Sequence, residues 1–188
     1  MRDLEAYGYF GLRMGADDFL ALGQTHERYE LVHGVVCMSP RPNTLHQRLL
    51  TLISLQLEGY AKSKPGVRFF PDVDVVLSPD TVYAPDLVCY RPGRIKAYPI
   101  RLDTPPDLII EILSHGTKSF DLTTKLEDYQ KFGVGEYWTY DPADGQLRVF
   151  RRDGAELGRV MVSGDTFECA TLPGFVIDLR PLREAALS

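Results

Sequence analysis

The chain has 188 residues, of which 44% are hydrophobic and 25% charged, and its formal net charge at pH 7 is -5. A chain of this length can bury roughly two-thirds of the surface that it exposes when unfolded, so we expect one compact domain over residues 1–188. The negative charge argues against a broad basic face that grips nucleic acid, because that affinity comes from Lys and Arg side chains neutralising phosphates. A small local site remains compatible with this charge.

Export and membrane insertion are not expected from the sequence. Acidic residues interrupt the first ten positions, and no run of roughly 18 uncharged apolar residues occurs. The three cysteines, Cys37, Cys89 and Cys169, are far apart and each lies within an apolar run, which favours reduced core thiols over disulfides or a zinc site. We therefore expect a cytoplasmic protein.

The N-terminal part predicts a short helix, a β-hairpin and a long helix. Acidic residues precede a helical pattern around Phe19, and two strand-like runs follow, hinged at His33-Gly34. The long helix has Asn43 or Thr44 as its N-cap and a Pro-Gly pair as its end. Its apolar residues share one face: Leu45, Leu49, Leu52, Ile53 and Tyr60.

The middle of the chain predicts the central sheet. Four short β-rich runs are separated by turn-forming residues, at 67–70, 73–77, 86–90 and 107–113. A helix then carries Leu122, Leu126 and Tyr129 on one face, ends near Gly133 and is followed by a strand at 136–141, which fits a strand-helix-strand crossover. The rest alternates short strands with Asp-Gly and Ser-Gly turns and predicts an accessory antiparallel β layer. The fold class is α/β, with a mixed sheet and flanking helices.

Glu111 stands in the middle of the apolar run at 107–113, where an unpaired buried carboxylate would be costly, so it requires a partner. Asp107 is four residues away, about 13 Å along a strand at roughly 3.3 Å per residue. That is too far for two carboxylates that share a metal. Asp86 is better placed, because the intervening residues allow a turn and a return on the adjacent strand, where opposite residues lie about 5 Å apart. The alternatives are a strand-entry turn residue for Asp86 and a salt bridge to a core arginine for Glu111.

Three further residues are candidates, each with a structural alternative. Lys125 falls at the edge of the buried helical stripe and could reach over the sheet, or it could be a snorkelling lysine paired with Asp121 at i-4. Glu30 begins a strand, where it could equally be a capping or edge-pairing carboxylate. His46 lies in the first turn of the long helix and could be an ordinary polar residue there.

Four segments of the chain carry a resemblance to a known family: RYELVHGVVCMSPRPNTLHQRL, VYAPDLVCY, the run from PPDLIIEILS to GEYWTYDP, and LPGFVIDL. They resemble the Uma-type putative restriction endonuclease family, a bacterial branch of the PD-(D/E)xK nuclease superfamily. The resemblance spans roughly residues 15 to 180. It implies a restriction-endonuclease-like core, with a divalent metal held by an Asp and a Glu on neighbouring strands. Carried over, these residues are Asp86 and Glu111.

The resemblance has one departure, because Leu113 stands two residues after Glu111, where the superfamily usually has its lysine. In the Uma-type branch a lysine of the next helix takes that place, which here is Lys125. Glu30 corresponds to an additional acidic residue that often completes the metal shell. His46 matches a histidine of the same branch and is a candidate substrate contact.

The resulting hypothesis is metal-dependent hydrolysis of DNA. Asp86 and Glu111 hold Mg²⁺ (or Mn²⁺), Glu30 contacts it directly or through water, and Lys125 orients the attacking water. Hard oxygen ligands favour magnesium. A homodimer would make cutting of both strands easier, and the β-rich C-terminal part is its candidate interface. The alternatives are a non-catalytic protein with the same fold that binds DNA or a protein partner, and a two-carboxylate glycoside hydrolase, which accounts for fewer of these residues.

Overall fold

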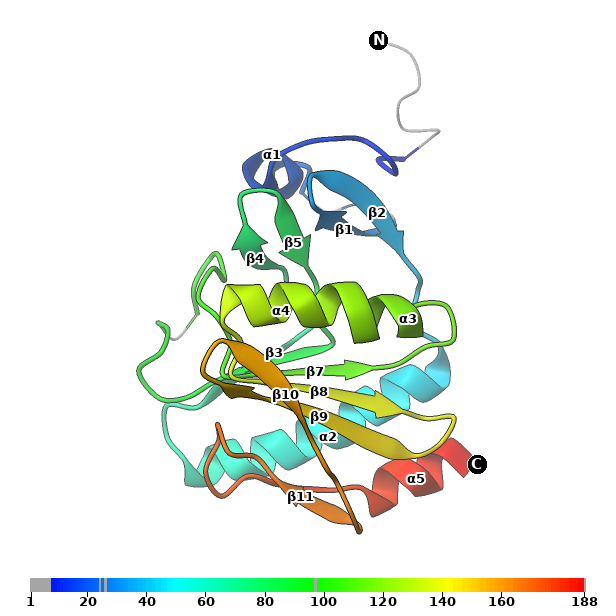
Figure 1. Ribbon diagram of the computed structural model, residues 1–188, viewed down its shortest axis with the longest axis vertical. Helices are drawn as coiled ribbons and strands as arrows, with labels where there is room; N and C mark the ends of the chain where they lie inside the picture. Colours follow the sequence, from blue (N-terminus) through cyan, green and yellow to red (C-terminus); the bar gives the residue numbers. More distant parts are fainter. Residues whose placement is uncertain (1–7, 24, 26, 97, 188) are drawn as a thin grey trace.

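A computed structural model describes residues 8–23, 25, 27–96 and 98–187 of the protein, and two sheets organise it (Figure 1). The larger sheet has six strands in the order β10-β9-β8-β7-β6-β3. Its strands are β3 (Arg68–Pro71), β6 (Leu87–Tyr90), β7 (Leu108–Ile112), β8 (Glu136–Asp141), β9 (Gln146–Asp153) and β10 (Glu156–Val160). Only β7 and β8 pair in parallel, and every other pairing in this sheet is antiparallel. The predicted mixed sheet is confirmed.

The parallel pair is joined by one helical segment, residues 118–132, which confirms the predicted crossover. The segment comprises α3 (Lys118–Phe120), a π-helical turn η1 (Asp121–Lys125) and α4 (Leu126–Phe132). It ends at Gly133, whose φ of 96° lies in the left-handed region that glycine adopts without steric cost.

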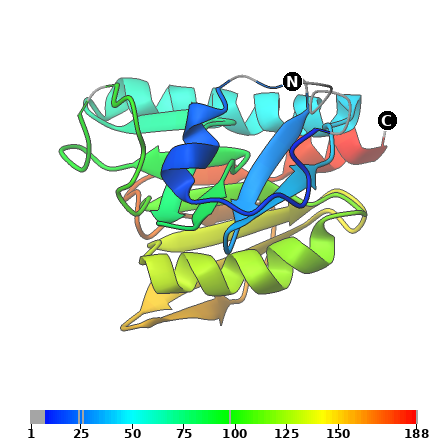
Figure 2. The ribbon, with the colours of Figure 1, turned by 90° about the horizontal axis from the view of Figure 1, so that it is seen from above.

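Helices cover both faces of the six-stranded sheet (Figures 1 and 2). The helical segment 118–132 lies over one face, while α2 (Thr44–Ser63) and α5 (Arg180–Leu187) lie over the other. Alternate residues of β7 face the two helical layers. Leu108, Ile110 and Ile112 pack with α2, whereas Ile109 packs toward α4. Because side chains alternate along a strand, Glu111 faces the same layer as Ile109, beneath the helical segment.

The second sheet lies beside the helical segment and has four antiparallel strands in the order β2-β1-β5-β4. Its strands are β1 (Arg28–Val32), β2 (Val35–Ser39), β4 (Val75–Ser78) and β5 (Thr81–Tyr83), and α1 (Ala16–Ala21) packs on it. The β1–β2 hairpin turns at His33 and Gly34 as predicted, both with positive φ.

The expectation that residues 73–77 join the central sheet is wrong. β4 belongs to the four-stranded sheet, where it pairs with β5, a strand that was not predicted. The chain changes direction at Asp72, whose φ of 50° ends β3 and takes β4 out of the larger sheet. Strand-like sequence alone does not reveal to which of two sheets a strand belongs.

The C-terminal part is only partly an accessory layer. β9 and β10 extend the six-stranded sheet, and the separate antiparallel ribbon is limited to β11 (Thr166–Glu168) and β12 (Val176–Asp178). The final helix α5 was not predicted, and its Leu182 is buried in the core cluster that includes α2. The three cysteines are free, with Cys89 and Cys169 buried. Among the helices of the described residues, none has the length and apolar character needed to cross a membrane.

Candidate functional site

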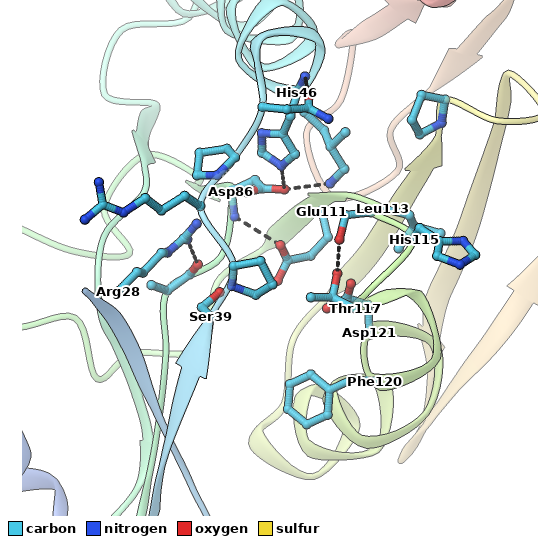
Figure 3. Close-up of a pocket in the computed structure, with 18 of the residues that line it drawn as sticks. Arg28, Ser39, His46, Asp86, Glu111, Leu113, His115, Thr117, Phe120 and Asp121 are labelled. Carbon is cyan, nitrogen blue, oxygen red and sulfur yellow. Dashed lines mark hydrogen bonds and ion pairs between the residues drawn. The ribbon is translucent and has the colours of Figure 1, made fainter. Parts of the chain in front are cut away.

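Glu30, Asp86, Glu111 and Lys125 line one cavity of about 210 Å³, which we call the carboxylate cleft. Figure 3 shows this cleft, with Asp86 and Glu111 among the labelled residues. The walls come from the β1–β2 hairpin, the loop that leads into α2, the ends of β6 and β7, and the helical segment 118–132. Residues that are nearly a hundred positions apart in the sequence thus meet in one place.

Asp86 and Glu111 are neighbours across two antiparallel strands, as predicted. The register of β6 and β7 pairs Leu87 with Ile110, which places Asp86 opposite Glu111. The Asp86 backbone N–H donates to Oε2 of Glu111 at 3.2 Å, and the Ile112 N–H donates to Oδ2 of Asp86 at 2.7 Å. Both carboxylates are therefore fixed by the backbone of the opposite strand.

The partner of Glu111 is Lys125, so the alternative of a core arginine is wrong. Nζ of Lys125 lies 2.9 Å from Oε1 of Glu111, and the hydroxyl of Tyr129 donates to the same oxygen at 3.1 Å. The two donors are four residues apart on the helical segment, so both project from one face.

The π-helical turn explains why Lys125 is more deeply placed than its predicted position at the edge of the stripe. Asp121, Lys125 and Tyr129 are buried, whereas Leu122 and Leu126 are only half-buried. A wide turn shifts the helical register, and such turns occur often at functional sites. Lys125 does pair with Asp121, at 3.6 Å, but its side chain is only 7% exposed, so it does not snorkel to solvent.

Glu30 connects the four-stranded sheet to the cleft. Its Oε1 accepts a hydrogen bond from the backbone N–H of Ala84 at 3.0 Å and lies 3.1 Å from Nζ of Lys125. Ala84 is two residues before Asp86, so Glu30 also anchors the segment that positions the Asp86 carboxylate. The side chain is therefore neither an edge-pairing carboxylate nor a cap.

His46 lies against Asp86. The side chain of Asn43 caps α2 by accepting from the His46 backbone N–H at 2.8 Å, which confirms the predicted N-cap. Nε2 of His46 is 3.0 Å from Oδ2 of Asp86. The ring thus contacts a carboxylate of the cleft, and its Nδ1 is buried with no hydrogen-bond partner among the described residues.

The cleft carries more negative than positive charge in its interior. Burial raises the pKa of Glu111 to about 8, an effect that the adjacent carboxylates strengthen and Lys125 opposes. Burial works against the Lys125 ammonium, but Glu111, Glu30 and Asp121 outweigh it and hold the lysine pKa well above its usual value. Burial also raises the pKa of Asp121.

The pKa of Asp86 is shifted in the opposite direction from those of Glu111 and Asp121. Burial would raise its pKa, but the hydrogen bond from His46 and the Ile112 N–H outweigh burial, so the pKa of Asp86 lies below its usual value. Asp86 therefore stays ionised more readily than Glu111 or Asp121.

The donor set suits a divalent cation of the magnesium type. Mg²⁺ prefers hard oxygen ligands, needs only one or two carboxylates and keeps several waters. Asp86 and Glu111 offer adjacent carboxylates, and the surplus negative charge favours a cation. In the described part of the chain, no three Asp, Glu, His or Cys side chains already form a metal-binding group. Glu30 and Asp121 are instead directed at the ammonium of Lys125.

Sequence reasoning missed several participants. Tyr129 was assigned to the core alone, although its position four residues after Lys125 would have placed its hydroxyl on the same face. Arg28, which also lines the cleft, precedes Glu30 by two residues and so shares its face of β1. The exclusion of Asp107 is confirmed, because its carboxylate pairs with Arg91 at 2.9 Å.

Comparisons with known proteins agree with this architecture. A crystal structure described as a putative nuclease belonging to DUF820, from Anabaena variabilis ATCC 29413, superposes with a TM-score of 0.79 and 19% sequence identity, over 92% of this chain and 99% of that one. At this identity the match shows the fold. A search of curated proteins finds no match. The model of the Uma2 family, described as "putative restriction endonuclease", matches residues 16–180, and the chain therefore belongs to the Uma2 family.

Proposed function

We propose that the protein is a divalent-metal-dependent nuclease that hydrolyses DNA phosphodiester bonds in the carboxylate cleft. The membership of the Uma2 family and the fold shared with a putative nuclease support this class of activity. The observation that carries the proposal is the buried group of Asp86, Glu111 and Lys125, held by two adjacent strands and the helical segment 118–132. Buried acids and a buried lysine at the floor of a cleft are costly for stability, which favours a functional reason for their presence.

Each residue has a defined part in the proposed reaction. Asp86 and Glu111 would hold the cation, with Glu30 close by. The cation, when bound, lowers the pKa of a coordinated water and stabilises negative charge on the phosphate oxygens. Lys125 would orient the attacking water. Tyr129 and His46, which contact Glu111 and Asp86, would fix the orientations of these carboxylates. Attack of water on phosphorus breaks one P–O ester bond and yields a phosphomonoester and an alcohol.

The test is cleavage of plasmid and labelled oligonucleotides with Mg²⁺ or Mn²⁺, and with EDTA. Wild-type protein is expected to cut only with the metal, and Glu111→Ala and Lys125→Ala proteins are expected to be inactive. Asp107→Asn is the matched control. Asp107 follows a proline, as Asp86 does, and adjoins β7, but its carboxylate pairs with Arg91 outside the cleft. A folded wild-type protein that cuts neither DNA nor RNA would contradict the proposal.

A further inference from the structure

We infer that Arg28 is a binding site for a phosphate of the DNA backbone at the edge of the carboxylate cleft. The inference rests on the proposed function, since it takes DNA as the substrate. Its starting point is charge: the cleft floor carries four carboxylates, and a polyanion that enters needs positive groups beyond the metal. The cationic side chains on the wall are those of Arg28, Arg41 and Lys125.

Lys125 is already committed to protein carboxylates. Its Nζ lies 2.9 Å from Glu111, 3.1 Å from Glu30 and 3.6 Å from Asp121. Three buried acids therefore compensate the charge of the Lys125 ammonium, which leaves little of it to attract the phosphates of a DNA strand at the cleft wall. Arg28 differs in this respect.

The guanidinium of Arg28 is held in place, and its side chain stays 21% exposed. Its Nη2 donates to the carbonyl oxygen of Ala84 and lies 2.7 Å from Oδ1 of Asp72. Its Nε is buried and has no hydrogen-bond partner among the described residues. Asp72 is 62% exposed, so water screens its charge and it compensates Arg28 only in part. A guanidinium that is held in place with its exposed edge on the cleft wall suits a phosphate, because guanidinium N–H groups form charge-assisted hydrogen bonds with phosphate oxygens.

The position of Arg28 places that edge beside the proposed metal ligands. Arg28 binds the carbonyl of Ala84, and Glu30 binds the N–H of the same residue, two positions before Asp86. Figure 3 shows Arg28 on the hairpin side of the cleft, across from the helix that bears Asp121. Arg28 also lines a neighbouring cavity of about 420 Å³ that shares Arg41, Pro42 and Ala84 with the cleft. That cavity is also lined by Glu27, Asp72 and Asp74, so Arg28 and Arg41 are the cationic side chains that a DNA strand leaving the cleft in this direction would meet.

The test measures DNA binding separately from cleavage. Fluorescence anisotropy of a labelled oligonucleotide is followed over a salt series, with Ca²⁺ in place of Mg²⁺ and the intact strand verified on a gel. Loss of one phosphate contact is expected to weaken binding about fivefold or more and to lower the slope of log affinity against log salt by about one. Arg28→Gln should show both effects, and Arg28→Lys should keep most of the slope.

Two controls separate phosphate binding from a structural role. Asp72→Asn removes a competing anion but keeps the arginine, so it is expected to bind DNA at least as tightly as wild type. Arg159→Gln removes an exposed arginine of β10 and should behave as wild type. An Arg28→Gln protein with the wild-type salt slope, or an Asp72→Asn protein as weak as Arg28→Gln, would overturn the inference while the proposed function stands. Failure of the wild type to bind any DNA would overturn both.

Discussion

The Nζ atom of Lys125 lies 2.9 Å from Oε1 of Glu111, between the crossover helix and the strand beneath it. Lys125 is therefore the partner that a glutamate inside an apolar strand requires. A divalent cation bound as proposed would be attracted to the same carboxylates as the ammonium. The two positive groups would then oppose each other, because like charges about 4 Å apart repel by several kcal/mol at a partly buried site.

Replacement of Lys125 by methionine is expected to tighten metal binding while it abolishes cleavage. The substitution keeps an unbranched side chain one atom shorter than lysine but removes the charge next to the carboxylates, so affinity for Mn²⁺ should rise about tenfold or more. Calorimetric titration of metal-free protein measures this. Lys118→Met is the control, since Lys118 belongs to the same helical segment but pairs with Asp141, and its affinity should match wild type. Weaker metal binding by Lys125→Met would refute the competition.

The stability of the metal-free protein is expected to fall as pH rises from about 4.5 to about 8. Burial raises the pKa of Glu111 from 4.5 to about 8, so within this window the folded protein retains a proton that the unfolded chain releases. Above pH 8 both states have lost it and the dependence levels off. The free energy of unfolding is measured with urea between pH 5 and 9, roughly the window of this titration. It should fall clearly with rising pH for wild type and much less for Glu111→Gln. Parallel curves for the two proteins would count against a raised glutamate pKa.

His46 is expected to matter for metal affinity through Asp86. Removal of a group that orients a metal ligand typically costs about 10–100-fold in affinity. His46→Ala should therefore weaken Mn²⁺ binding by about tenfold, and His46→Gln, which retains a donor, should restore part of it. Asn43→Ala serves as the comparison, because loss of the N-cap costs about 1 kcal/mol of stability and leaves the ring contact intact. Equal metal affinity of His46→Ala and wild type would show that Asp86 needs no such support.

Asp128 is expected to be important for stability. It accepts a hydrogen bond from the hydroxyl of Tyr83 and lies 3.0 Å from Nε2 of His33, so it ties α4 to the four-stranded sheet. Asp128→Ala leaves the buried Tyr83 hydroxyl unpaired and should lower the free energy of unfolding by about 2–3 kcal/mol, measured with urea. Lys131→Ala removes only an exposed partner 3.8 Å from Asp128 and should change it by less than about 0.5 kcal/mol.

Much of the fold and part of the site followed from sequence pattern. The long helix, the crossover and the meeting of Asp86 with Glu111 depend on periodicity and on the regular spacing of strands, which local sequence encodes. The assignment of β4 failed because the chain changes direction between β3 and β4, at Asp72, whose positive φ the strand-like pattern of residues 73–77 does not reveal. The inward position of Asp121 and the deep burial of Lys125 were not predicted, because a helical wheel assumes a constant 3.6 residues per turn and the π-helical turn breaks that assumption.

The way in which distant segments close the carboxylate cleft has a consequence for folding. Glu30 reaches Lys125 across 95 positions of the chain (125 minus 30), and His46 reaches Asp86 across 40. Contacts between residues so far apart form late, because the entropy of closing long loops must be overcome first. Uptake of the proposed cation should thus follow the formation of these long-range contacts, and a chain that still lacks the helical segment 118–132 has no assembled carboxylate cleft.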